Sequence, residues 1–172
     1  MRIDIRPGDA SWEVAGPLLN AVWPPDLVAS LPWGHLSTAH ADFRVLVTHD
    51  GELVSHVGLF VRDCDWNGRL VHVGGIGGVA TAERQRGFGF ASAAMKAAMA
   101  VLERDHEVDF GLLFCEDHNI AFYRRLGWQS FNGTVFAEQP GGRIHHNSVA
   151  PFIYDLKLAP RQGVIDLRGL PW

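Results

Sequence analysis

Apolar and polar residues alternate in short segments along the first half of the chain, a pattern typical of β-strands. Residues 2–6 alternate and precede a Pro-Gly pair, so they predict a short strand that ends in a turn. A helix is expected over residues 11–22, where a serine can cap its start and two prolines end it. Residues 24–41 have no clean period and predict irregular structure or short broken helices, a kind of segment that is often functional.

Two hairpins are predicted in the centre of the chain. Residues 43–48 form the first strand, a turn of sequence HDGE follows, and residues 53–61 return. The dipeptide Asn67-Gly68 marks a second hairpin turn, which leads into a glycine-rich strand over residues 69–80. These segments predict neighbouring antiparallel strands.

The hydrophobic period then becomes that of a helix. Residues 91–102 are predicted to be helical, and the apolar run over 109–115 predicts a buried strand. A second helix over 119–126 ends at Gly127, and residues 149–158 are interpreted as a late strand. This order of elements predicts an α+β fold, with a mixed, largely antiparallel central sheet flanked by helices.

Length and composition indicate one soluble domain. At 172 residues the chain can bury a core unaided, and no shift in composition marks a boundary, so we expect a single domain over residues 1–172. Apolar residues make up 47% and charged residues 20%, which is typical of globular proteins. No apolar run reaches the roughly 20 residues of a membrane span, and the first residues lack the apolar core of a secretory signal.

Cysteine usage and charge narrow the expected environment. Cys64 and Cys115 lie far apart in the sequence, which fits free thiols in a reducing cytoplasm better than a disulfide. The formal net charge of −4 argues against a nucleic-acid surface and is compatible with a small cationic substrate.

The most informative segment is residues 84–91, RQRGFGFA, between the glycine-rich strand and the first long helix. Free amides and the dipole of a helix start favour an anion, glycines let a pyrophosphate approach the backbone, and arginines add charge-assisted bonds. The segment is neither a Walker loop nor a dinucleotide fingerprint, because neither spacing is present. A polar helix start with a glycine for close packing is the alternative.

The spacing Arg84-x-x-Gly87-x-Gly89 resembles the acyl-CoA loop of the GNAT superfamily of N-acetyltransferases, written Q/R-x-x-G-x-G/A. Residues 122–128, FYRRLGW, are similar to a second signature of that family, F/L-Y-x-x-x-G-F/W. The two motifs occur in the family's order, separated by a helix and a strand, and the resemblance covers about residues 43–131.

The resemblance implies a GNAT-like fold that uses acetyl-CoA as co-substrate and needs no metal. The residues it assigns to CoA binding are Val79, Ala80, Arg84, Gln85, Arg86, Gly87, Phe88, Gly89, Asn119 and Phe122. In the family the motif tyrosine, here Tyr123, faces the acetyl-CoA sulfur. A phenol with a pKa near ~10 can protonate a thiolate whose conjugate acid titrates near ~8.5. The alternative is a helix-terminal tyrosine that packs on the sheet.

The glycines of residues 74–78 occupy a strand that, in the family, separates from its neighbour and admits the pantetheine arm. Main-chain groups there, of which Val79 and Ala80 are the candidates, bind the arm and polarise the thioester carbonyl. The alternative is a bulged, weak strand or a loop.

The resemblance does not identify a general base in this chain. Many family members carry a glutamate on this strand, but no carboxylate lies between Leu70 and Ala82. His72 has a suitable pKa, although a strand histidine facing solvent is the alternative. Glu116 and His118, after the following strand, are rival candidates.

The final segment, residues 165–172, is similar to the tail of aminoglycoside 2'-N-acetyltransferases, in which the end of the chain helps to bind the aminosugar. Trp172 is therefore a candidate substrate-binding residue, but Leu170 stands where that family has a substrate-binding acid. A tail docked on the core is the alternative. The polar segment over 138–148 predicts a loop, and its His145-His146 pair is interpreted as solvated side chains that bind no metal.

Together, these features predict an N-acetyltransferase that transfers acetyl to a primary amine of a small molecule by direct attack. An aminoglycoside-like acceptor is one candidate. A non-catalytic acyl-CoA-binding sensor domain and a protein-lysine acetyltransferase are the alternatives. We expect no nucleic-acid or membrane partner, and the sequence leaves a homodimer open.

Overall fold

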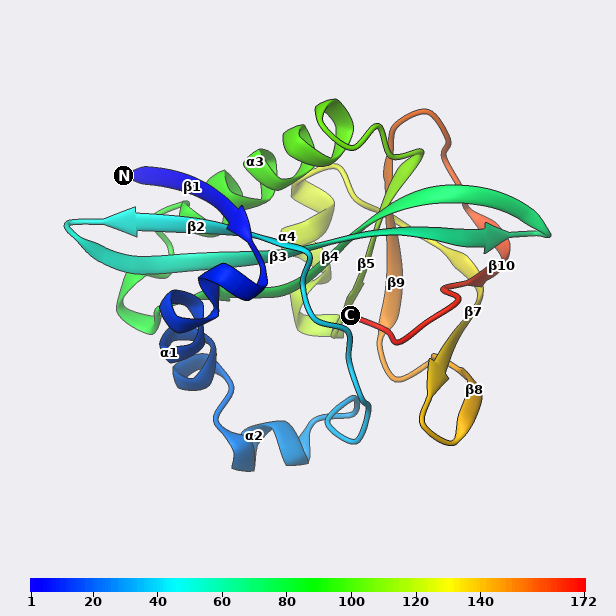
Figure 1. Cartoon of the computed structure of the whole chain (residues 1–172), viewed down its shortest axis with the longest axis horizontal. Helices are drawn as coiled ribbons and strands as arrows, with labels where there is room; N and C mark the ends of the chain where they lie inside the picture. Colours follow the sequence, from blue (N-terminus) through cyan, green and yellow to red (C-terminus); the bar gives the residue numbers. More distant parts are fainter.

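The computed structural model describes residues 1–172 as one mixed sheet with helices on both faces (Figure 1). The ten strands are β1 (Arg2–Pro7), β2 (Phe43–His49), β3 (Glu52–Trp66), β4 (Arg69–Thr81), β5 (Phe110–Cys115), β6 (Gln129–Ser130), β7 (Asn132–Gln139), β8 (Gly142–His145), β9 (Ala150–Asp155) and β10 (Gln162–Asp166). The α-helices are α1 (Trp12–Val22), α2 (Pro25–Ser30), α3 (Phe90–Arg104) and α4 (Ile120–Arg125).

The strand order is β6-β9-β5-β4-β3-β10-β7-β8, and β2 with β1 lies along the first half of β3. The pairs β4–β5 and β10–β7 are parallel, and all others are antiparallel. The predicted α+β class and its mixed, largely antiparallel sheet are confirmed.

Helices α3 and α1 cover opposite faces of the sheet. Val45 and Val47 of β2 belong to the core beneath α3, whereas the guanidinium of Arg44 stacks on Trp12 of α1 at 5.2 Å. This alternation follows from the two-residue period of a strand, which turns successive side chains to opposite faces. Figure 1 shows α3 across one side of the strands, with α1 and α2 on the other side.

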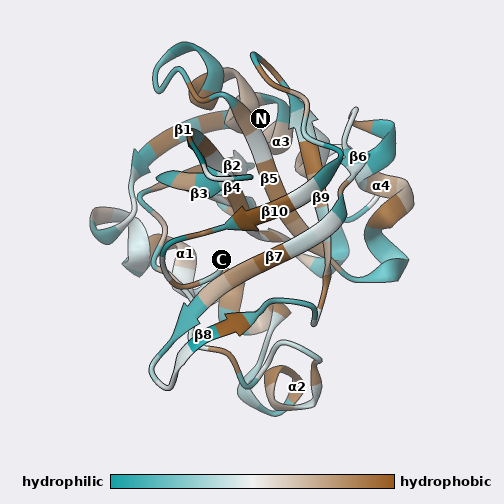
Figure 2. Cartoon of the chain, turned by 90° about the vertical axis from the view of Figure 1, so that its right-hand side faces the viewer, coloured by the Kyte–Doolittle hydropathy of each residue, from teal (hydrophilic) through white to brown (hydrophobic).

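A second core forms on the face opposite α3, between the central strands and β7 with β10. It combines Val73 and Leu112 of β4 and β5 with Val135 and Ile165 of β7 and β10. Figure 2 shows β7 and β10 side by side next to the C-terminus. The sheet therefore curls, and its far strands cover its own centre.

The last residues of the chain fill this curled face. Arg62 donates to the carbonyl of Leu170 at 2.8 Å, and the indole N–H of Trp172 donates to the carbonyl of Leu112 at 3.2 Å. The Trp172 ring also stacks on Phe60, with 5.6 Å between centroids. The tail thus docks on the core.

Two local predictions differ from the structure, and one strand was not foreseen. The polar segment over 138–148, predicted as a loop, contributes to the β7–β8 hairpin. Strand β10 and its pairing with β7 were not predicted. Ser11 does not cap α1, because its hydroxyl donates backwards to the carbonyls of Pro7 and Gly8.

Most of the glycines in β4 give space to large side chains. A Cβ at Gly75 would lie 2.3 Å from Cε2 of Trp172, and one at Gly74 would lie 2.8 Å from Cδ1 of Leu102 on α3. Gly77 faces the Trp172 backbone in the same way, at 3.3 Å. The glycine run therefore permits close packing on both faces of β4.

Gly75→Val is expected to lower the free energy of unfolding by about 1–3 kcal/mol, because the new side chain must displace Trp172 from a packed core. Urea unfolding followed by tryptophan fluorescence measures the change. Gly141→Val is the control, since a Cβ there has no neighbour within 4 Å. Equal stability of the two variants would contradict this account of the glycines.

Candidate active site

Strands β4 and β5 separate at the centre of the sheet. They pair only from Val73 with Phe110 to Ile76 with Leu113. Beyond that point β4 continues to Thr81 beside β3, while β5 continues to Cys115 beside β9. Facing main-chain groups are left without a strand partner on each side of this β4–β5 gap. Such groups need hydrogen-bond partners, and an extended ligand with amide groups can supply them.

A β-bulge turns β4 at the start of the gap. The β3–β4 register shifts between His56 and Gly58, and Gly78 has φ +56°, a left-handed conformation that glycine adopts without steric cost. The bulge predicted as one alternative for the glycine run is thus present. It lets β4 leave β5 while keeping its pairing with β3.

Two buried polar residues hold the bulge. His56 Nδ1–H donates to the Gly78 carbonyl at 2.7 Å, and His56 Nε2 accepts from Arg44 Nη1 at 3.0 Å. An arginine can only donate, so this contact fixes the histidine tautomer. Arg44 Nε in turn donates to the Gly8 carbonyl at 3.2 Å. The position of the bulge is therefore tied to the start of the chain.

Burial lowers the pKa of His56 to about 4; the Gly78 hydrogen bond opposes this shift, and the charge of Arg44 adds to it. Burial also lowers the pKa of Arg44. His56 is consequently neutral in the folded protein at any pH well above 4.

Folding stability is expected to fall as the pH drops from about 6.5 towards 4. Unfolded His56 binds a proton near its ordinary pKa while folded His56 does not, so acid favours the unfolded state, by about 2–3 kcal/mol at pH 4.5. Urea unfolding at pH 7.5 and 4.5 measures this loss. His56→Gln removes the titrating group and should lose less stability on acidification; an equal loss would contradict the assignment.

The segment predicted to hold phosphate joins β4 to α3. Gly87 and Gly89 have φ +85° and +84°, and a Cβ at either position would meet no atom within 4 Å. The first bond of α3 runs from the Ala93 amide to the Gly89 carbonyl, so the amides of residues 90–92 have no backbone acceptor. A helix of this length presents such amides and its positive dipole end to an anion.

The side chains of this loop project into solvent. Arg84 and Arg86 are exposed, and Arg86 Nε donates to the Thr81 carbonyl at 3.3 Å. Phe88 is 72% exposed, while Gln85 is half-buried. Two cations therefore stand beside the free amides of α3 with no carboxylate partner.

Tyr123 lies in α4, buried in the core beneath α3. Burial, followed by the neighbouring thiol of Cys115, raises its pKa. Burial likewise raises the pKa of Cys115 to about 11. The Tyr123 side chain is therefore a neutral phenol, suited to donating a hydrogen bond at the end of β5.

The rest of the tyrosine motif fixes this position. The Tyr123 carbonyl accepts from the amides of Leu126 and Trp128, and Gly127, at φ +93°, ends the helix. Trp128 is 1% exposed and anchors the turn in the core. Phe122 meets the Tyr123 ring edge to face, 5.0 Å between centroids.

The other predicted CoA-binding residues lie at two places. Val79 and Ala80 are on the β4 edge of the gap, where the Ala80 carbonyl accepts from the Ser55 hydroxyl at 2.8 Å. Asn119 ends a short turn before α4, and its backbone N–H donates to the Glu116 carbonyl.

The structure separates the three base candidates. His72 lies near the other end of β4, where Nδ1 is 2.7 Å from Asp63 Oδ1 and its amide donates to Asp109. Glu116 follows β5 directly, with His118 Nε2 3.9 Å from its Oε2. Glu116 and His118 follow the strand that borders the gap, whereas His72 lies at the opposite end of β4, so His72 has no part in the proposed reaction.

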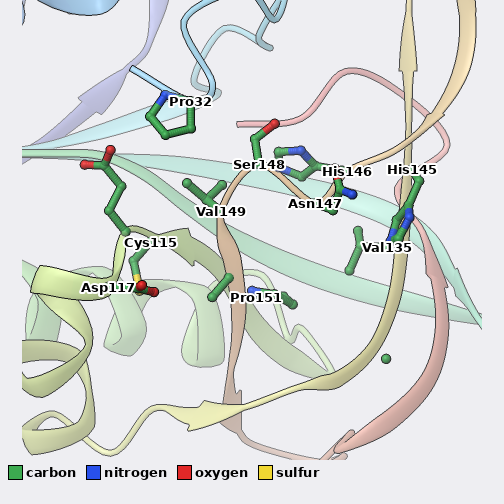
Figure 3. A pocket seen from close by; sticks show the side chains of 13 residues that line it. Pro32, Cys115, Asp117, Val135, His145, His146, Asn147, Ser148, Val149 and Pro151 are labelled. Carbon is green, nitrogen blue, oxygen red and sulfur yellow. The ribbon is translucent and has the colours of Figure 1, made fainter. Parts of the chain in front are cut away.

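A cavity of about 480 Å³ lies at the end of β5, on the side of the β7–β9 connection (Figure 3). We call it the β5-end cavity. It is lined by Pro32, Cys115, Glu116, Asp117, Gly133, Val135, His145, His146, Asn147, Ser148, Val149, Ala150 and Pro151. Figure 3 shows Cys115 and Asp117 at one side of the view, with Val135, His145 and His146 at the other.

One correction concerns the histidine pair of this cavity. His145 is exposed as predicted, but His146 is only 4% exposed and is not a solvated loop residue. Its amide donates to Val135 of β7, and its ring packs against Phe114 of β5. Because these contacts are distant in sequence, local polarity gave no signal of burial.

No group of three or more histidine, cysteine, aspartate or glutamate side chains is arranged to hold a metal ion. None of the helices is both long and apolar enough to span a membrane.

One protein family covers both the loop before α3 and the tyrosine motif of α4. The family described as "Acetyltransferase (GNAT) domain" matches residues 33–131, more than half of the chain. The chain therefore belongs to the GNAT acetyltransferase family. Its fold is shared with YhbS of Escherichia coli, solved in complex with CoA, at a TM-score of 0.62 and 19% identity over 97% of this chain and 89% of that one.

Two further relatives extend the comparison. A GNAT acetyltransferase from Brucella melitensis, solved in complex with acetyl-CoA, has a TM-score of 0.57 at 15% identity, over 95% of this chain and 94% of that one. An aminoglycoside 2'-N-acetyltransferase from Mycolicibacterium fortuitum is 30% identical over 110 residues, 64% of this chain and 54% of the relative. The chain thus spans about half the length of the curated relative it matches.

Proposed function

We propose that this chain, acting as one domain, is an acetyl-CoA-dependent N-acetyltransferase of a small-molecule primary amine. The observation that carries the proposal is the β4–β5 gap, which lies beside a loop with two exposed arginines and free helix amides. The gap offers main-chain partners to the amides of a pantetheine arm, and the loop offers cations and N–H groups to a pyrophosphate.

The reaction follows from this placement. The amine nitrogen forms a bond to the thioester carbonyl carbon, and the carbonyl electron pair moves to oxygen, where β4 amides in the gap stabilise it. When the carbonyl re-forms, the carbon–sulfur bond breaks and the thiolate leaves. The phenol of Tyr123 donates its hydrogen bond to that sulfur and supports its protonation.

The acceptor is proposed to be a cation in its resting form. Glu116 and Asp117 line the β5-end cavity and would attract an ammonium group. The Mycolicibacterium relative, by its name an aminoglycoside acetyltransferase, makes aminosugars the first candidates. Trp172 is proposed as part of the wall on the acceptor side, where it packs against Phe114. The buried free thiols support a reducing, cytoplasmic setting.

The test is a thiol-release assay with acetyl-CoA and a panel of aminoglycosides, polyamines and amino acids. We expect saturable release of CoA thiol with one acceptor class, accompanied by acetylated product in mass spectrometry. Release that does not depend on any amine would contradict the assignment.

A non-catalytic acyl-CoA sensor is the second candidate, because β4 carries no carboxylate between Leu70 and Ala82. It predicts tight CoA binding without turnover on any amine. Amine-dependent turnover would exclude it.

A further inference from the structure

His146 is a buried imidazole without a hydrogen-bond partner. It is 4% exposed, and neither Nδ1 nor Nε2 has a donor or acceptor in reach. Leaving a polar group buried and unpaired costs free energy, so such a group is rare in a folded protein and calls for an explanation. The side chain lines the β5-end cavity, where a ligand can supply the missing partner.

The position of His146 links this cavity to the β4–β5 gap. Its ring lies edge to face on Phe114, 4.4 Å between centroids. Phe114 is the first residue of β5 beyond Leu113, the last one paired with β4. Cys115, the next residue, lines the cavity itself. The histidine is therefore packed on the strand segment that forms the β5 side of the gap.

The reaction needs a proton acceptor near the acceptor amine, at the end of β5. Once the amine nitrogen has bonded to the thioester carbon, it carries a positive charge and must lose a proton before the amide is complete. Neither a β4 carboxylate nor His72 is available, for the reasons given above. Glu116 and Asp117 line the same cavity, but Asp117 is exposed and Glu116 is partly exposed, so neither is a buried, unpaired group like His146.

Building on the proposed function, we propose that His146 is the catalytic residue that accepts the proton of the acceptor amine in the β5-end cavity. An acceptor that arrives as an ammonium ion first releases one proton to water, because only the neutral amine has the lone pair that attacks. After the attack, the nitrogen gives a second proton to a free ring nitrogen of His146, and Tyr123 gives its phenolic proton to the leaving sulfur. The imidazolium then releases its proton to water and the phenolate takes one from water, so that, counted from the neutral amine, one proton moves from nitrogen to sulfur. No metal, oxidant or further co-reactant is required.

The surroundings of His146 suit this role. Burial, and then the neighbouring His145, lower its pKa to about 4, so the imidazole is neutral and free to accept at physiological pH. The charged or titratable groups around the cavity are Cys115, Glu116 and Asp117 at the end of β5 and His145 on its own segment. β7 contributes only Gly133 and Val135.

The experiment compares His146→Gln, His146→Leu and, as a control outside the cavity, His106→Gln with the wild-type chain. We expect both His146 variants to lose on the order of 100-fold in kcat while the Kd for CoA stays constant. His106→Gln, whose ring packs on Phe43 away from the cavity lining, should retain activity. His146→Leu should fold at least as stably as the wild type, because it removes two buried unpaired nitrogens. This variant therefore separates a catalytic from a structural role.

Two further measurements distinguish proton acceptance from a packing role. They are the dependence of the rate on the basicity of the acceptor amine and the recovery of the rate on addition of free imidazole. The defect of His146→Gln should shrink with acceptors of low amine pKa, whose proton leaves readily, and free imidazole should restore part of the rate to His146→Ala. A kcat within about threefold of wild type in His146→Gln would overturn this inference and leave the proposed function untouched. Wild-type CoA binding without turnover on any amine would overturn the proposed function, and this inference with it.

Discussion

Tyr123→Phe is expected to lower kcat by about 100-fold or more while the Kd for CoA changes by less than about twofold. The substitution removes only the hydroxyl, so the ring keeps its place in the core beneath α3. What is lost is the hydrogen bond to the departing sulfur, which forms as negative charge develops there. Steady-state kinetics with a responsive amine, together with calorimetric titration of CoA, measure both quantities.

Tyr154→Phe is the matched control, because the chain has two tyrosines and the Tyr154 ring packs against Trp128. It should retain wild-type kcat. If Tyr123→Phe turns over at the wild-type rate across the pH range, the role assigned to the phenol is wrong even when CoA binds normally.

The double substitution Arg84→Ala with Arg86→Ala is expected to raise the Kd for CoA by about 100-fold, because charge-assisted hydrogen bonds to phosphate are among the strongest in proteins. The affinity of the wild-type chain should also weaken with added salt, and the variant should depend less on salt. Calorimetry at two ionic strengths measures both effects.

Arg104→Ala with Arg161→Ala is the control for net charge. Arg104 is exposed at the opposite end of α3 and pairs with Asp105, and Arg161 pairs with Asp155. This variant loses the same two positive charges far from the loop and should bind CoA as the wild type does. Equal weakening in both double variants would mean that overall charge, and not the loop, determines affinity.

The parts of the site that depend on neighbouring residues could be predicted from the sequence. Gly87 and Gly89 have the left-handed conformations that their place before α3 requires. Gly127 ends α4 in the predicted way, and Tyr123 stands in the helix that the motif predicted. Turns and helix ends are determined by residues a few positions apart, so a single sequence contains the necessary information.

The parts that depend on distant residues could not be predicted. Trp172 contacts Gly75, almost a hundred positions earlier, and His146 becomes buried only because the β7–β8 hairpin brings it onto Phe114. His56 gave a weak signal, as a polar residue within an apolar strand, but its bond to Gly78 follows from the bulge. Such contacts follow from the register of the sheet, which single-sequence patterns specify poorly.

An amide-resolved nuclear magnetic resonance titration of the chain with CoA tests the central claim most directly. The account predicts saturable shifts at two sets of amides, residues 77–81 on the β4 edge of the gap and residues 86–92 at the start of α3. The shifts of both sets should follow a single binding curve. An absence of saturable shifts, or shifts confined to other surfaces, would contradict the assignment of this gap and loop as the CoA site.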